Sequence, residues 1–349
     1  MVSTRRDFGR MALAGMPLAQ AVAAINSKFK GVQIGAITYS FGQTPVNQII
    51  PALADIGLGE VELMSNHCEG LAGAPPMPSF GRGRGPGGPP PAATAVPAQP
   101  PAAGQPGGAQ GGPPPGGGRR GGRMPLTPEQ QEEMKKAQEA LAKWRTDATA
   151  NTWKAVRKQF NDAGIEVAVL CYNMNDNMKD SDIEYGFQMA KGLGVKAIST
   201  STTLTMAKRI APIADEHKLL VGYHGHDATN DPNQTATLES YATLMAYGKY
   251  NGINLDIGHF TAAGYDAVPF IREHHDKITN LHLKDRKKNH GPNTPWGEGD
   301  TPIKDVLLLL EKEKYKFPAN IELEYAVPEG SDRVKEMKKC LDYCKQILT

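Results

Sequence analysis

Short apolar runs alternate along most of the chain with longer stretches in which apolar residues recur at helical spacing. The short runs are typical of buried strands, and the longer stretches are typical of amphipathic helices. Strands are predicted at Val32–Ser40, Glu60–Met64, Glu166–Tyr172, Lys196–Thr200, Leu219–His224, Gly252–Ile257, Ile278–Leu283 and Asn320–Tyr325. Helices are predicted at Val46–Ile56, Pro128–Ala163, Ile183–Leu193, Thr205–Glu216, Leu238–Tyr247, Val268–His275, Ile303–Lys314 and Asp332–Leu348.

This alternation predicts an α/β fold with a parallel sheet, because parallel neighbours need a crossover connection. Eight strand–helix units close a (β/α)8 barrel, the TIM barrel, and the length outside the low-complexity segments suits one. A doubly wound open sheet is the alternative. It would need a glycine-rich phosphate turn after an early strand, and the segment "GAITYSFGQ" does not supply one.

A stretch rich in proline and glycine separates the second and third predicted strands, over residues 70–125. It has almost nothing apolar to bury, so it cannot repay the entropy of folding. We predict a disordered insertion after strand 2, within a single barrel domain over residues 30–349. Binding of RNA or an acidic surface by its arginine–glycine pairs is an alternative to a solvated spacer.

The first 24 residues have the features of an export signal. Arg5 and Arg6 are followed by Phe8, a weakly apolar run and the small residues Ala21–Ala23. This order is typical of a twin-arginine signal, which the export machinery reads as an address. The sequence therefore predicts a periplasmic or secreted protein. The apolar run is too short to form a membrane span, so no membrane span is expected after the signal is removed. A merely basic N-terminus is the alternative.

Charge and cysteine content add two limits. The signal (+2) and residues 65–125 (+4) together carry a net charge of +6, whereas the whole chain carries +2, so the rest of the predicted barrel is mildly acidic. This argues against a nucleic-acid partner.

The cysteines Cys68, Cys171, Cys340 and Cys344 lack zinc-ribbon spacing. Cys340 and Cys344 share a helix face, where either a disulfide or two core residues would fit.

Polar side chains collect where the predicted strands end, which is where TIM barrels carry their chemistry. Asp256, His282 and Glu324 each stand in an apolar run, and a buried charge is costly without a partner. His224 and His226 are two residues apart on one strand and should face the same way. Imidazole and carboxylate together suit Mn²⁺, Co²⁺, Zn²⁺, Fe²⁺ or Mg²⁺. The sequence therefore predicts a divalent metal site.

These motifs resemble those of the xylose isomerase-like TIM barrel superfamily, the sugar phosphate isomerase/epimerase group that also includes inosose dehydratases and endonuclease IV. The resemblance implies that Asp256, His282 and Glu324 bind the metal, with Glu322 as the competing choice in the last strand. It also implies that His259 lies beside the substrate. The motifs that carry it are "EVEL" (60–63), "YHGHD" (223–227), "LDIGH" (255–259), "HLKD" (282–285), "WGEGD" (296–300) and "IELEY" (321–325).

The fifth strand departs from the epimerase pattern. Many epimerases have a glutamate there, which is both a metal ligand and one of two acid–base carboxylates, but this chain has His224. Imidazole serves as a ligand, so His224 is predicted to bind the metal. The second base is then missing or is supplied by Glu62 or His226. The "YHxH" pattern resembles the inosose dehydratase-like branch.

The resemblance implies a divalent-metal-dependent sugar isomerase or epimerase. Glu324 or Glu62 would remove the proton α to a carbonyl, and the metal with His259 or Lys284 would stabilise the enediolate. In the predicted site His226 faces the substrate. Lys284 and Asp285 could instead form an ion pair that supports His282.

Two other functions stay open. A metal-dependent lyase or dehydratase would use the same site for β-elimination on a keto-sugar or inosose, and a secreted sugar-binding protein would lack catalysis. An endonuclease-IV-like phosphodiesterase is less favoured, because it would need more metal ligands and a basic groove. The predicted partner is a small sugar or keto-sugar, and a homo-oligomer is compatible with the sequence.

Overall fold

The computed structural model describes residues 23–78 and 126–349. The predicted export signal, up to residue 22, and residues 79–125 of the predicted insertion lie outside the described residues. The chain divides into two units: Met1–Ala74 with Ala148–Thr349, and Pro75–Asp147. The second unit contains helix α3 (Pro128–Asp147), which has no buried residue.

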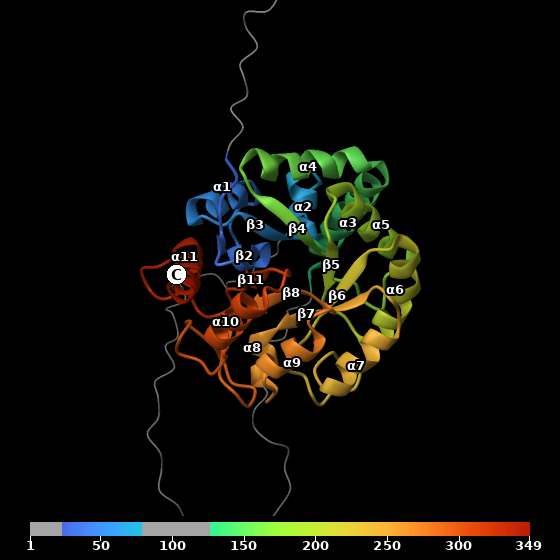
Figure 1. The fold of residues 1–349 in the computed structure, drawn as a ribbon. Coiled ribbons are helices and arrows are strands. Elements are labelled where there is room, and N and C mark those ends of the chain that lie inside the picture. The colour runs from blue at the N-terminus through green and yellow to red at the C-terminus, as the bar shows by residue number, and fades with distance from the viewer. Residues whose placement is uncertain (1–22, 79–125) are drawn as a thin grey trace, which may run out of the picture. The chain divides into compact units, whose positions relative to one another are not determined.

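Eight parallel strands form a closed barrel in the first unit (Figure 1). Strand β2 pairs with both β11 and β3, which closes the ring. The prediction of an α/β TIM barrel is therefore confirmed. The barrel strands are β2 (Val32–Ile37), β3 (Glu60–Met64), β4 (Glu166–Cys171), β5 (Ala197–Thr200), β6 (Leu220–His224), β7 (Asn251–Asp256), β8 (Ile278–Leu283) and β11 (Ala319–Ile321).

Two strands, β2 and β11, end well before the predicted residue, whereas β4 and β7 end one residue early. Strand β2 stops at Ile37 because residues Thr38–Phe41 form the 3-10 helix η1. Strand β11 stops at Ile321, although the N–H of Glu322 still donates to the carbonyl of Leu283 at 2.9 Å. At these ends the buried hydroxyl of Ser40 connects the two segments, since it donates to the carbonyl of Ile321 at 3.2 Å and accepts from the N–H of Leu323 at 3.0 Å.

Helices connect the strands and surround the barrel (Figure 1). The predicted helix over residues 128–163 is two helices, because Thr149 caps a new helix in a capping box with Thr152. Helices α2 (Ser65–Leu71) and α8 (Ile257–Ala262) and the short strands β1 (Lys28–Phe29), β9 (Asp285–Arg286) and β10 (Asn293–Thr294) were not predicted. The other helices are α1 (Val46–Ile56), α4 (Ala150–Asp162), α5 (Asp180–Leu193), α6 (Leu204–His217), α7 (Leu238–Ala246), α9 (Ala267–His274), α10 (Ile303–Glu313) and α11 (Arg333–Leu348).

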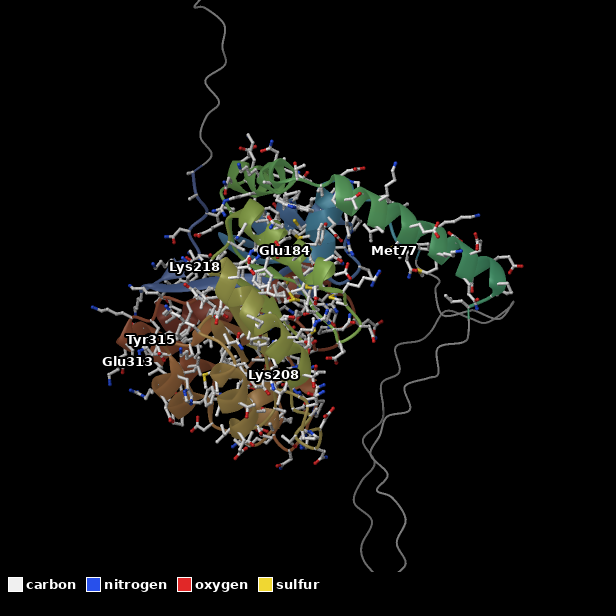
Figure 2. All side chains as sticks on the ribbon, turned by 90° about the vertical axis from the view of Figure 1, so that its right-hand side faces the viewer. Met77, Glu184, Lys208, Lys218, Glu313 and Tyr315 are labelled. Atoms are coloured by element: carbon white, nitrogen blue, oxygen red, sulfur yellow. The ribbon has the colours of Figure 1, made fainter. Side chains whose placement is uncertain are left out.

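The helices bury their apolar sides against the strands. Trp153 and Phe160 of α4 are buried, as is Phe187 of α5, whereas Glu184 of α5 and Lys208 of α6 lie at the surface in Figure 2. Burial of this kind is the main stabilising contribution to such a fold. Over the described ranges, no helix is both long enough and apolar enough to cross a membrane.

Candidate metal centre and active site

Four buried residues meet at the mouth of the barrel: His224, Asp256, His282 and Glu322. They come from β6, β7 and β8 and from the residue after β11, and these strands are neighbours in the sheet. One ligand atom of each lies within 4.8 Å of the ligand atoms of the others. We call these four residues the metal group. Three of its members are residues that the sequence predicted as ligands.

The fourth member is Glu322, whereas the sequence prediction favoured Glu324 and gave Glu322 as the competing choice. Glu322 directly follows β11, and its N–H bonds to Leu283 of the neighbouring strand, so its side chain stays with the strand ends. Glu324 lies further along, where the chain has left the sheet. Its Oε2 is 2.6 Å from Nζ of Lys284 and 3.3 Å from Nδ2 of Asn293. The arrangement favours Glu322 as the ligand.

The metal group fits a divalent cation. The Nδ1 atom of His224 is buried and has no hydrogen-bond partner among the described residues. Burial and the neighbouring His282 hold the pKa of His224 well below its ordinary value, so its imidazole is neutral and has a free lone pair. Two imidazoles and two carboxylates form a donor set suited to Zn²⁺, Fe²⁺, Co²⁺ or Mn²⁺.

Lys284 supplies a buried positive charge beside the metal group. Its Nζ lies 3.0 Å from Asp256, 2.9 Å from Glu322 and 2.6 Å from Glu324. Burial by itself would lower the pKa of Lys284, but the three carboxylates outweigh it and raise this pKa. Gly258 makes room for the side chain, since a Cβ there would lie 2.2 Å from Cγ of Lys284. Lys284 is only 1% exposed and lies behind the pocket wall.

Asp285 has a different partner from the one predicted. Its carboxylate accepts hydrogen bonds from the N–H groups of Gly297 at 2.8 Å, Gly299 at 2.9 Å and Thr301 at 3.2 Å. The interpretation of Lys284 and Asp285 as an ion pair is therefore wrong. Asp285 instead holds the loop that contains the "WGEGD" motif.

Glu62, predicted as a candidate base, does not face the pocket. It is fully buried, and its Oε2 accepts hydrogen bonds from His282 Nε2 at 2.8 Å, Asn280 Nδ2 at 2.8 Å and Asn320 Nδ2 at 3.0 Å. Its Oε1 accepts a hydrogen bond from Ser199. Because β3 continues for two residues beyond Glu62, this side chain lies beneath the metal group, where it fixes His282 instead of meeting a substrate.

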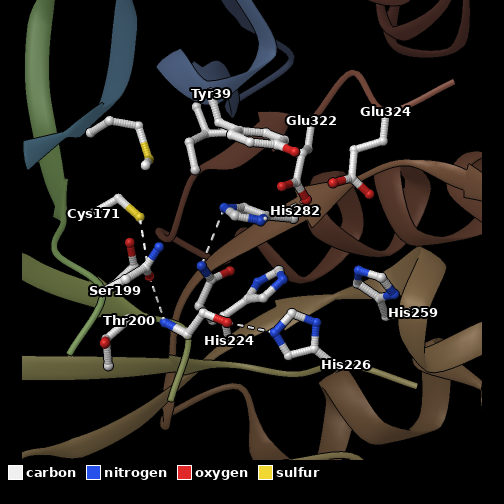
Figure 3. A pocket seen from close by; sticks show the side chains of 15 residues that line it. Tyr39, Cys171, Ser199, Thr200, His224, His226, His259, His282, Glu322 and Glu324 are labelled. Carbon is white, nitrogen blue, oxygen red and sulfur yellow. Dashed lines mark hydrogen bonds and ion pairs between the residues drawn. The ribbon is translucent and has the colours of Figure 1, made fainter. Parts of the chain in front are cut away.

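A pocket of about 190 Å³ opens beside the metal group. Figure 3 shows Cys171, Ser199 and Thr200 on one side of it, and Glu322, Glu324 and His259 on the other. His224, His226, His259, His282 and Glu324 thus meet in one pocket, as predicted from the strand ends. The lining residues are Ile37, Tyr39, Met64, Cys171, Asn173, Ser199, Thr200, Ser201, His224, His226, Asn254, His259, His282, Glu322 and Glu324.

The two histidines outside the metal group are each held by a neighbour that the sequence analysis missed. His226 Nε2 lies 2.5 Å from Oγ of Ser201, and burial and His259 lower the pKa of His226 to about 4. His259 Nδ1 lies 3.5 Å from Asp227. Ser201 directly follows β5, so the strand-end rule could have found it, but a serine is too common in loops to stand out.

His226 and His259 also form a second candidate group with His224, again with ligand atoms within 4.8 Å. This group lacks a carboxylate to balance a cation's charge. The metal group is therefore the better site for one divalent ion.

Comparison with known proteins supports the fold. The family model described as xylose isomerase-like TIM barrel matches residues 201–347. No curated protein matches the chain. The resemblance of the motifs to this superfamily is thus confirmed over the C-terminal part of the barrel.

Solved structures resemble the chain over nearly their whole length. The probable 3-DHS dehydratase AsbF of Bacillus anthracis is 14% identical, with a TM-score of 0.55, and the match covers 89% of this chain and 98% of that one. The 3-keto-D-glucoside 4-epimerase YcjR of E. coli is 12% identical (TM-score 0.53, 90% and 99% covered). The IolI protein with a bound zinc atom is also 12% identical (TM-score 0.54, 91% and 99% covered). At these identities the similarity shows the shared fold.

Proposed function

We propose that this protein is a divalent-metal-dependent isomerase or epimerase of sugars, which removes a proton from the carbon next to a carbonyl. The observation that carries the proposal is the metal group, placed beside a pocket that Glu324, His226 and His259 also line. A divalent cation held by the metal group would supply Lewis-acid chemistry, which favours negative charge developing on the substrate. The zinc atom in the similarly folded IolI protein supports this choice of cofactor.

Glu324 is the proposed proton acceptor. Its carboxylate lines the pocket, and 23% of the side chain is exposed, so a substrate can reach it. Lys284 at 2.6 Å holds the carboxylate in place as a positioning residue. A base positioned in this way accelerates proton abstraction by roughly 10² to 10⁴-fold.

His226 and His259 are the proposed partners of Glu324. Because Glu62 lies outside the pocket, His226 is the remaining candidate for the second proton-exchanging group, and Ser201 fixes its ring. His259 lines the pocket beside Glu324, with Nζ of Lys284 3.1 Å from its Nε2 and Arg286 beside its Nδ1, so these two cations hold its ring at the substrate position. Epimerisation needs proton exchange on two faces of one carbon, which this set of groups could provide.

A lyase or dehydratase is the second candidate function. The observation that favours it is the presence of His224 where many epimerases have a glutamate. Among the described residues, Glu324 is then the one pocket carboxylate outside the metal group. A β-elimination needs one base and one acid that protonates the leaving group of the substrate, and this pocket could supply both the base and the acid. Export by the twin-arginine machinery, a periplasmic location, the sugar partner and a homo-oligomeric state remain predictions from the sequence.

The test combines metal content with deuterium exchange in the purified full chain. Wild-type protein should hold about one divalent ion per chain, and Asp256→Ala should hold none. Asp55→Ala, an exposed aspartate of α1, is the matched control and should behave as wild type. In D₂O with a panel of ketoses and keto-sugars, wild type should incorporate deuterium α to the carbonyl.

Two outcomes would count against the proposal. Wild-type protein that takes up no metal under any loading condition would exclude the proposed centre. Absence of both deuterium exchange and elimination across the whole panel would leave the sugar-binding protein as the better interpretation.

A further inference from the structure

We infer that the pocket selects an uncharged, unphosphorylated sugar over sugar phosphates and sugar acids. This inference rests on the proposed function and narrows the substrate class of the same site.

The first observation is the charge of the pocket wall. Within the described residues, no lysine or arginine lines the pocket, whereas the carboxylates of Glu322 and Glu324 do. A divalent cation in the metal group and the adjacent Lys284 would together carry three positive charges, which Asp256, Glu322 and Glu324 would balance. An anionic substituent on a sugar would therefore meet no net positive charge, and like charges brought together cost several kcal/mol.

The second observation is that the nearby cations are already paired. Lys284 contacts three carboxylates within 3.0 Å. Arg286 donates to Asp227 at 3.0 Å and to the carbonyl of Gly291 at 2.8 Å. Recruiting either side chain for a phosphate would leave a largely buried carboxylate without its partner, which is strongly destabilising.

The third observation concerns the usual phosphate site of TIM barrels, in the loops after the seventh and eighth strands. After the seventh barrel strand, β8, the N–H groups of Gly297, Gly299 and Thr301 could form an anion-binding loop, but the carboxylate of Asp285 already occupies them. The chain thus places its own anion where a phosphate would otherwise bind.

The eighth strand offers no better site. After β11, Arg333 donates to the carbonyls of Ser40 and Leu323. The side chain of Asp332 caps the N-terminus of α11 through the N–H of Lys335. The donors that could bind a phosphate are again used by the chain itself.

The opposite wall of the pocket suits hydroxyl groups. Asn173, Thr200 and Ser201 line the pocket with one amide and two hydroxyls, and Figure 3 shows Thr200 across from the carboxylates. Such groups both donate and accept hydrogen bonds, as sugar hydroxyls do. The chemistry of the wall therefore matches a neutral polyhydroxy ligand.

Matched pairs of compounds test the inference on the full chain loaded with Mn²⁺. The pairs are D-fructose with D-fructose 6-phosphate, D-glucose with D-glucuronate, and D-glucose with D-glucose 6-phosphate. Binding is measured by protection against thermal unfolding, and chemistry by deuterium exchange in D₂O. The neutral member should bind about tenfold or more tightly than its charged partner.

The result that overturns the inference is a charged member that binds as well as, or better than, its neutral partner. Equal responses within every pair, including no response to either member, also overturn it. If the neutral sugars bind selectively but nothing exchanges or eliminates, the proposed function fails while the selectivity stands. The two failures are therefore distinguishable.

A charge introduced into the wall provides an independent check. Met64 lines the pocket at the end of β3. Met64→Lys should shift the ratio of affinities toward the phosphate ester by about tenfold, and the matched Met64→Gln variant should leave the ratio near that of wild type. An unchanged ratio in Met64→Lys would show that wall charge does not set the selection.

Discussion

The Nε2 atom of His282 lies 2.8 Å from Oε2 of Glu62, and this contact ties the candidate metal group to the polar layer beneath it. Both side chains are buried in the barrel. The other ring nitrogen, Nδ1, lies 3.0 Å from Glu322 within the metal group. A histidine whose far nitrogen bonds to a carboxylate has a fixed ring orientation, which favours metal binding by the near nitrogen.

Replacing Glu62 should therefore weaken metal binding without removing a ligand. In Glu62→Gln the buried carboxylate becomes an amide with a single, uncharged acceptor oxygen. The side-chain amides of Asn280 and Asn320 still donate to this position, so the hydrogen bond to His282 is weakened. The expected loss in metal affinity is roughly 10 to 100-fold, measured by competition with a fluorescent chelator. Glu166→Gln, on the neighbouring strand β4 and partly exposed, should bind as wild type. A Glu62→Gln variant with unchanged affinity would refute this role.

Glu322 and Glu324 should separate metal binding from proton transfer. Glu322→Gln is expected to lose the bound metal, because it removes a carboxylate from the metal group. Glu324→Gln should keep the metal and slow deuterium exchange by about 10² to 10⁴-fold. The metal content and the rate of deuterium exchange are measured for both variants, whose substituted residues lie two positions apart in the sequence. The opposite pattern would restore Glu324 as the ligand.

Metal binding should release a proton from His282. Burial alone would lower the pKa of His282, but the carboxylates of Glu62 and Glu322 outweigh it and raise this pKa well above its ordinary value. The metal-free ring is therefore protonated at neutral pH, and a metal ligand must be neutral. A raised pKa means that protons compete with the metal at low pH, so metal affinity should increase with pH.

Calorimetry in two buffers of different ionisation enthalpy measures this release directly. About one proton per bound cation is expected at pH 7. His290→Gln, which changes an exposed histidine, should release the same amount. Metal affinity that is independent of pH between 6 and 8 would contradict the assignment.

Asp285 should control the order of the loop over residues 295–301. Asp285→Ala removes the acceptor of three backbone N–H groups. Hydrogen bonds to a charged group contribute about 1.5–3 kcal/mol each, although their contributions are not additive. The expected results are faster amide hydrogen exchange in this loop and a lower free energy of unfolding. Asp285→Asn keeps one acceptor oxygen and should lose less, whereas wild-type exchange in Asp285→Ala would show that other contacts hold the loop.

The sequence by itself determined the fold and most of the candidate ligands. Eight apolar runs separated by amphipathic stretches can bury their surfaces in few ways, and the closed barrel is one of them. His224, Asp256 and His282 stood out because polar residues at the ends of apolar strands are costly unless they are paired or bound. The local pattern marked these residues as candidates, and the resemblance to the superfamily implied their ligand roles, with His224 at the position where many epimerases have a glutamate.

Only the tertiary structure decided between residues that share the same local pattern. Glu322 and Glu324 have the same strand parity, but β11 ends at Ile321. Both carboxylates contact Lys284, yet Glu322 joins the metal group, whereas Glu324 lies outside it and also contacts Asn293. Glu62 lies in an apolar run like the ligands, yet its layer in the barrel places it beneath them. The height of a residue along the barrel axis depends on how all eight strands close into the ring. The same closure decides which charges from distant strands pair. The spacing of residues within one strand does not contain that information.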